Sequence, residues 1–202
     1  DNSADIHFGP EDNTSLTNSL GAVYDGNIST PLSRVSMNNT FWQLKNNSSM
    51  HTLKLDNTQL NFKQHKGFSA LDVGRLDINN IRVFITSDGF LSDKINVKQS
   101  ITGKNNTLIV APSATSTGKS SSPVSLISAP AGTSPEFFSL KTVTRNIGFS
   151  LITPDVSTVS TEDATKWVLN GFPGHNSVAV ADAPAGFPVS LSSVSRSVCP
   201  VA

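Results

Sequence analysis

A short apolar pattern recurs in this chain at a fixed interval, and it limits the possible folds more than any other feature. The first copy is Leu55, Asp56, Leu60 and Phe62, and the second is Leu76, Asp77, Ile81 and Val83. The same offset separates each pair of equivalent positions (76 − 55 = 83 − 62), and Phe41 stands one offset before Phe62. A repeat of about 20 residues made of strand-like pieces is typical of a solenoid of stacked β coils.

The residues around this repeat alternate between apolar and polar, as in half-buried strands. The alternating pairs include Trp42/Leu44, Leu53/Leu55, Leu71/Val73, Ile81/Val83, Ile95/Val97 and Leu108/Val110. Asn, Ser, Gly and Asp separate the runs, and helical spacing is not sustained anywhere. The sequence therefore predicts an all-β solenoid that is regular from about residue 36.

The alternation also assigns side chains to the inside and the outside of the solenoid. If Leu53 and Leu55 point inward, Lys54 and Asp56 point outward. The offset of the repeat then stacks Arg75 on Lys54, and Asp77 on Asp56. We expect diagonal contacts between unlike charges to offset the repulsion within this ladder, each by only roughly 0–1 kcal/mol.

Asparagines recur near one phase of the repeat, at Asn38-Asn39, Asn57 and Asn79-Asn80. Asn tolerates left-handed backbone angles and can hydrogen-bond its own backbone. We therefore predict a column of asparagines at the corners of successive coils. The glycosylation sequons that start at residues 38, 47 and 105 are interpreted as parts of corners rather than as glycan sites.

Composition excludes some functions and leaves others open. The 202 residues carry 15 basic and 15 acidic side chains, so the chain lacks the positive charge typical of nucleic-acid or anionic-membrane binding. The single cysteine, Cys199, permits neither an intrachain disulfide nor a zinc knuckle. We predict no metal and no cofactor, and no stretch approaches the roughly 18 apolar residues of a membrane span.

The regular pattern is absent from the N-terminal residues and becomes interrupted again after Ile85. Residues 1–31 are rich in turn signals and predict irregular or edge coils. Residues 89–93 are expected to form an inserted loop, and residues 111–123 a Ser/Thr-rich excursion. Beyond them, larger aromatic side chains predict a cap that closes the open end of the solenoid.

Two arrangements raise the question of catalysis. His7, His51, His65 and His175 have no nucleophile context and are interpreted as surface or packing residues. Stacked Asp56 and Asp77 resemble the clustered acids of solenoid enzymes that cleave acidic polysaccharides. A solvated ladder is favoured, since cationic neighbours lower carboxylate pKa values rather than raising them.

Three ordered blocks near the C-terminus resemble a known family. They are residues 126–138 (LISAPAGTSPEFF), 145–150 (RNIGFS) and 164–172 (ATKWVLNGF). In this order they resemble the end of the secreted passenger of bacterial serine protease autotransporters. Weaker similarity extends over most of residues 36–172.

The resemblance implies a right-handed parallel β-helix over residues 1–125 with a C-terminal β cap over residues 126–172. The cap resembles the autochaperone region of that family, which folds first and templates the rest of the passenger during secretion across the outer membrane. The cap residues expected to matter for folding are Phe137, Phe138, Gly148, Phe149, Trp167, Leu169, Gly171 and Phe172.

The chain departs from the family pattern in two places. It contains no Gly-Asp-Ser-Gly nucleophile segment, so we expect no catalytic residue in it. A protease domain elsewhere would make the parent protein a secreted serine endopeptidase. After Phe172 the family continues into a linker helix that enters a membrane barrel, whereas residues 173–202 show no helical pattern and stay unassigned.

Three hypotheses follow for function. The first is a non-catalytic β-helix and autochaperone fragment, secreted or on the bacterial cell surface. Its expected partners are upstream coils and a protease domain of the same chain and an outer-membrane barrel, with no nucleic acid. The second is an adhesin-like module that binds host surface ligands through outward residues such as Lys54 and Asp56. The third is a polysaccharide-cleaving β-helix enzyme.

Overall fold

The structure is a computed structural model that describes residues 3–7, 23–62, 67–121, 123–173 and 176–177. These residues form β-strands and loops, with no helix among them. The first strands are β1 (Ser3–His7), β2 (Val23–Asn38), β3 (Phe41–Leu44), β4 (Ser48–Asp56), β5 (Gln59–Phe62), β6 (Ala70–Asn79), β7 (Arg82–Ser87) and β8 (Lys94–Lys104). The later strands are β9 (Asn106–Pro112), β10 (Val124–Pro130), β11 (Phe138–Thr142), β12 (Arg145–Ile147), β13 (Ser150–Ile152), β14 (Asp155–Ser160), β15 (Ala164–Gly171) and β16 (Asn176–Ser177).

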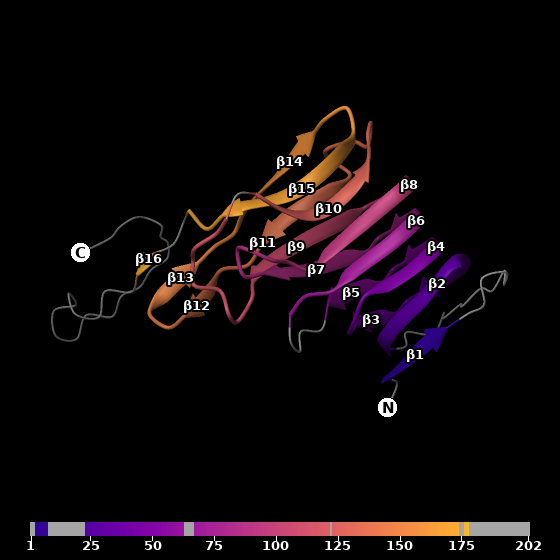
Figure 1. The fold of residues 1–202 in the computed structure, drawn as a ribbon, viewed down its shortest axis with the longest axis horizontal. Coiled ribbons are helices and arrows are strands. Elements are labelled where there is room, and N and C mark those ends of the chain that lie inside the picture. Colours follow the sequence, from indigo (N-terminus) through magenta and orange to yellow (C-terminus); the bar gives the residue numbers. More distant parts are fainter. Residues whose placement is uncertain (1–2, 8–22, 63–66, 122, 174–175, 178–202) are drawn as a thin grey trace.

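The strands stack in parallel, one coil on the next. β3, β5, β7, β9 and β11 form one parallel ladder. The longer strands β2, β4, β6, β8 and β10 form a second one. Figure 1 shows the second ladder from β2 at the N-terminal end to β10. The predicted all-β parallel β-helix is confirmed.

The longer strands bend across two faces, and the bend is visible in the register. β4 pairs with β6 through Met50 and Val73, and then again through Thr52 and Arg75. One unpaired residue of each strand lies between these two pairs: His51 in β4 and Gly74 in β6. Each coil therefore has three faces: one from the short strand and two from the long strand.

The interior of the coils is apolar. The buried core includes Ile28, Val35, Met37, Trp42, Leu44, Met50, Leu53, Leu55, Leu60, Leu71, Val73, Leu76, Ile78, Ile81, Val83, Ile85, Ile95, Leu108 and Val110. The inward phase predicted for Leu53 and Leu55 is confirmed, because these side chains are 0% and 1% exposed. Burial at every second residue explains the period of two in the sequence.

The coils do not share one length, so the predicted constant offset is wrong. Asn39, Asn57, Asn80 and Asn105 have positive φ angles between 49° and 63°. They mark one corner in successive coils, and the steps between them are unequal (57 − 39 = 18, 80 − 57 = 23, 105 − 80 = 25). The predicted asparagine column is confirmed. Its members define the register better than the apolar residues do, because the backbone requires them at one place in each coil.

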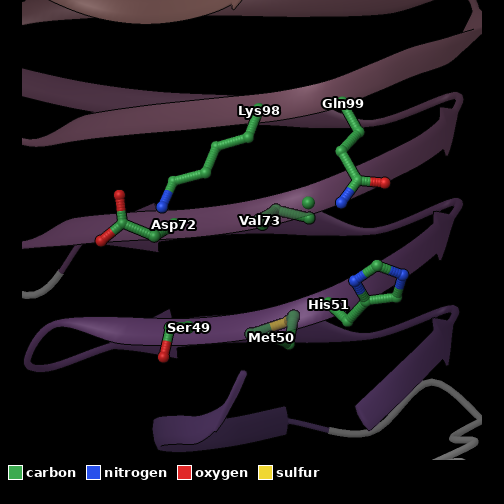
Figure 2. A pocket seen from close by; sticks show the side chains of 8 residues that line it. Ser49, Met50, His51, Asp72, Val73, Lys98 and Gln99 are labelled. Carbon is green, nitrogen blue, oxygen red and sulfur yellow. The ribbon is translucent and has the colours of Figure 1, made fainter. Parts of the chain in front are cut away.

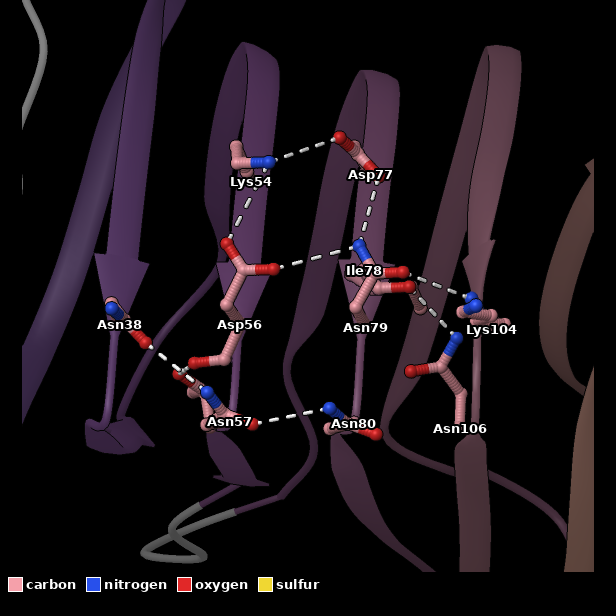
Figure 3. A network of polar contacts seen from close by, with 11 residues as sticks. Asn38, Lys54, Asp56, Asn57, Asp77, Ile78, Asn79, Asn80, Lys104 and Asn106 are labelled. Atoms are coloured by element: carbon pink, nitrogen blue, oxygen red, sulfur yellow. Dashed lines mark hydrogen bonds and ion pairs between the residues drawn. The ribbon is translucent and has the colours of Figure 1, made fainter.

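The asparagine column is held by side-chain amides that bond from coil to coil (Figure 3). Asn57 Nδ2 donates to Asn38 Oδ1 at 3.5 Å, and Asn80 Nδ2 donates to Asn57 Oδ1 at 3.2 Å. Asn47 of the second sequon accepts a hydrogen bond from the backbone N–H of Ala70 at 2.8 Å. These asparagines therefore have structural roles between coils.

The true register changes the predicted charge ladder. Lys54 lies beside Asp77, and Asp56 lies beside Asn79. Lys54 Nζ is 3.4 Å from an Asp77 carboxylate oxygen and 3.7 Å from one of Asp56 (Figure 3). The expected stacking of Arg75 on Lys54 and of Asp77 on Asp56 is wrong, because the coil between them is longer than the apolar pattern indicated (77 − 54 = 23, against 76 − 55 = 21).

The irregular segments fall partly where they were expected. The loop between β7 and β8 contains Gly89 to Asp93, and the predicted excursion overlaps the loop between β9 and β10. The turn signals Asp25-Gly26-Asn27 and Pro31, by contrast, lie inside the long strand β2. β2 pairs with β3 up to Asp25 and with β4 from Ser29, and its register with β4 shifts between Thr30 and Arg34. β2 therefore passes from one face of the coil to another within this stretch.

Candidate functional site

The strand direction changes at the C-terminal end of the solenoid. β15 pairs antiparallel with β10, and β14 pairs antiparallel with β15. These two strands extend the sheet beyond β10 (Figure 1). They lie within residues 126–172, the cap expected from the sequence. From here on, the name cap is kept for β14 and β15 with the buried side chains beneath them.

Trp167 lies at the centre of the cap. Its side chain is 0% exposed. The ring of Phe138, in β11, meets Trp167 edge to face at 5.0 Å between centroids, and the Phe137 ring meets Phe138 in the same way at 5.0 Å. Trp167 Nε1 has no hydrogen-bond acceptor among the described residues. The cluster thus joins the end of one ladder to the cap mainly by apolar packing.

The end of β15 packs closely against two loops. Gly171 has a φ angle of 146°, and a Cβ atom on it would stand 2.8 Å from Ser120 Oγ. A Cβ on Gly89 would stand 2.9 Å from the Phe172 ring, and Ser121 N donates to Gly89 O at 2.9 Å. Glycines at both positions therefore let the two loops approach the cap.

The other cap residues singled out from the sequence divide into two groups. Leu169 and Phe172 are buried and belong to the apolar core. Gly148, with φ of 62°, and Phe149 lie at the turn between β12 and β13, where Phe149 is 69% exposed. The structure thus places Phe149 outside the buried aromatic cluster around Trp167.

Asp93 is a buried carboxylate that the sequence did not single out. It is 1% exposed. One oxygen accepts from Ser69 N at 3.1 Å, and the other accepts from Thr86 N at 3.1 Å and Thr86 Oγ1 at 2.9 Å. Burial raises the pKa of Asp93 to about 6, against these hydrogen bonds. Its position after a loop of turn residues was the only signal for it.

The residues weighed for catalysis are not brought together. Asp56 and Asp77 contact Lys54 instead of forming a stacked acid pair. His51 lies at the bend of β4, while only the backbone of His7 is described, and His65, His175 and Cys199 lie outside the described residues. Within the described part, no group of three His, Cys, Asp or Glu side chains could hold a metal ion. No helix there is long and apolar enough to cross a membrane.

Together these features define the class of protein: a parallel β-helix with a capped C-terminal end. No protein-family model matches the chain. It is 36% identical over 159 residues to the serine protease EspC of Escherichia coli O127:H6, and this match covers 79% of the chain and 12% of the relative. It is 35% identical over 172 residues to the serine protease EatA of E. coli O78:H11, covering 85% of the chain and 12% of that protein.

A third relative covers still more of the chain. The serine protease EspP of E. coli O157:H7 is 33% identical in an alignment of 198 positions that covers 90% of the chain and 15% of EspP. The chain belongs to the serine protease autotransporters, as a segment of the passenger of such a protein. It is accordingly secreted or displayed on the bacterial surface, as the sequence predicted. It spans between 12% and 15% of the length of these relatives.

Proposed function

We propose that this chain is the C-terminal part of an autotransporter passenger and that its cap acts as an autochaperone. The cap would form first, and the coils would then add to it one at a time toward the N-terminus. The protease activity named for the relatives would belong to another part of the parent protein. Its upstream coils, protease domain and outer-membrane barrel would be the partners of this segment.

One observation carries the proposal: the switch from parallel to antiparallel pairing around Trp167. Antiparallel neighbours can be joined by short turns, and β14 and β15 are consecutive in the chain. The parallel ladders need contacts between residues that are a whole coil apart, such as Lys54 and Asp77 at a separation of 23 residues. Local contacts close at a lower entropic cost, which favours the hairpin as the first structure.

Templating needs an exposed strand edge with free backbone groups. A β coil offers its N–H and C=O groups to the next coil along the whole edge. β10 has a paired strand along each of its two edges: β8 on one side and β15 on the other. Once the hairpin and β10 are paired, the free edge of β10 can therefore receive β8.

The test compares a cap variant with a shaft variant. Trp167→Ala and Leu53→Ala each remove a side chain that is 0% exposed, and each should cost about 2–5 kcal/mol of stability. If the cap nucleates folding, Trp167→Ala slows refolding and Leu53→Ala mainly speeds unfolding. Stopped-flow refolding and unfolding rates measure both. A Trp167→Ala variant that refolds at the wild-type rate would contradict the proposal.

A further inference from the structure

β11 is the last strand of the first ladder, and one of its edges has no partner strand. Its residues Phe138 to Thr142 pair with β9. Among the residues that the structure describes, no strand pairs with the other edge. The cap covers the second ladder instead, since β15 pairs with β10, and β16 pairs with β13 rather than with β11. The described part of the chain therefore leaves the end of the first ladder open.

The side chains at this open edge lack the cover that they have in earlier coils. Leu140 continues an inward column of the ladder, because it lies beside Leu108 in the register. The earlier members of this column are only 0% or 1% exposed: Trp42, Leu60, Val83 and Leu108. Leu140, by contrast, is 38% exposed. Thr142, in the column of Val110, is exposed as well, so this end of the interior needs a further strand to cover it.

The same residues direct their backbone groups to the open edge. Val143 N donates to Val110 O of β9 at 2.9 Å. In a parallel ladder the N–H and C=O of one residue point to one edge, and those of the next residue point to the other. Val143 and Lys141 therefore face β9, whereas Leu140 and Thr142 face the open edge. A row of such groups is a template for a further strand.

The charges around the open edge favour an acidic partner. Residues 137–154 include Lys141 and Arg145 and contain no acidic residue. Lys141 is exposed, and it points outward because its neighbours Leu140 and Thr142 lie in inward columns. On an added strand, the outward residue beside Lys141 would lie within reach of its ammonium group. A carboxylate at that position is attracted, and a second cation is repelled.

We propose that β11 binds an extended segment of a separate polypeptide as one more parallel strand of the first ladder. The segment would place apolar side chains over Leu140 and Thr142 and an acidic side chain beside Lys141. β11 of a second copy contains no acidic residue, so it would not supply that side chain. Backbone hydrogen bonds would give the affinity, and the alternating side chains the specificity.

A peptide titration followed by amide chemical shifts of the isotope-labelled 202-residue chain tests the proposal. The probe is Ac-Thr-Val-Glu-Val-Thr-NH2, whose valines lie over Leu140 and Thr142 when its glutamate lies beside Lys141. So short a strand should bind with a Kd of about 1 mM, so the peptide is added to about 5 mM. Amides between Ser139 and Val143 should shift, and those of β4 and β6 should not. The inference does not depend on the role of the cap in folding.

Two altered peptides distinguish strand addition from apolar adsorption. In the first, the backbone nitrogens of the glutamate and of the second threonine are methylated. This removes the N–H groups that would donate to the carbonyls of Leu140 and Thr142, so binding should weaken at least about tenfold. In the second peptide, lysine replaces the glutamate. Binding should then weaken about threefold or more, because like charges meet at Lys141.

Lys141→Glu is the decisive variant. It should reverse the preference, so that the lysine peptide binds more tightly than the glutamate peptide. Lys98→Glu changes an exposed lysine on β8, in the second ladder, and should keep the wild-type preference (Figure 2). Melting curves check that both variants fold. Absence of shifts in β11, equal binding of the methylated peptide, or an unchanged preference in Lys141→Glu would overturn the proposal.

Discussion

The side-chain oxygen of Asn106 accepts a hydrogen bond from the backbone N–H of Ile81 at 3.1 Å. Its amide nitrogen donates to the Ile78 carbonyl at 2.9 Å, so one side chain satisfies the backbone on both sides of the corner at Asn80 (Figure 3). Asn106 is 2% exposed and belongs to the next coil. A buried amide therefore ties the corner of one coil to the strand above it.

Replacing Asn106 should lower the stability of the solenoid more than the replacement of an exposed polar residue does. Asn106→Ala leaves a buried N–H and a buried C=O without partners, and each unsatisfied group costs about 1–3 kcal/mol. Urea unfolding should show a lower midpoint with an unchanged slope. Asn105→Gly is the control, because glycine accepts the positive φ of that corner. Equal loss of stability in both variants would contradict this role for Asn106.

The left-handed corners give a second prediction, at Asn57. Its φ angle is 49°. An alanine there loses both amide contacts of the column and adds backbone strain of roughly 1–2 kcal/mol. A glycine loses the same contacts without the strain. Thermal melting should therefore rank the wild type above Asn57→Gly, and Asn57→Gly above Asn57→Ala.

The register can be tested by exchanging charges between coils. Lys54→Asp should place three carboxylates together, and Asp77→Lys in the same chain should restore an unlike pair. The side chains of Lys54 and Asp77 are 50% and 42% exposed, so the coupling energy should be about 0.2–1 kcal/mol and should shrink in high salt. A double-mutant cycle measures it. A coupling energy of zero at low salt would argue against the contact.

Burial of the Asp93 carboxyl makes the stability of the protein depend on pH. Its folded pKa of about 6 lies above the ordinary value of 3.8, so the native state holds this proton more tightly than the unfolded state does. Its contribution is greatest below about pH 4 and is lost as the pH rises through 6.

The measurement compares melting temperatures at several pH values for the wild type and Asp93→Asn. The difference between the two should change between about pH 4 and 6, because only the wild type retains the titrating group. Asp88→Asn, in the same loop, is the control: its carboxylate accepts from Phe90 N and Leu91 N at 2.8 Å and lies outside the core. A difference that is flat with pH for Asp93→Asn would contradict the effect of burial on this carboxylate.

Much of the fold can be predicted from the sequence, because its signals are local. Alternation assigned Leu53 and Leu55 to the interior, and asparagines marked the corners. The register could not be obtained in the same way. Apolar side chains of similar size can exchange places within a core, so a match of Leu55 with Leu76 fits the pattern although Leu55 lies beside Ile78.

The candidate site was predicted only in part, for a different reason. Trp167 could be assigned to a buried cap because a large aromatic ring in a strand pattern favours burial. The buried carboxylate of Asp93 depends on contacts between residues a whole coil apart, such as Ser69 with Asp93. Such contacts follow from the register, which the apolar pattern did not define.

Pulse-labelling hydrogen exchange during refolding tests the central claim most directly, since it reports which amides become protected first. Folding from the cap predicts that amides of β10, β14 and β15 gain protection before those of β2, β4 and β6, with β8 between them. Protection that starts in β4 and β6, or that arises in all strands at one rate, would contradict folding from the cap.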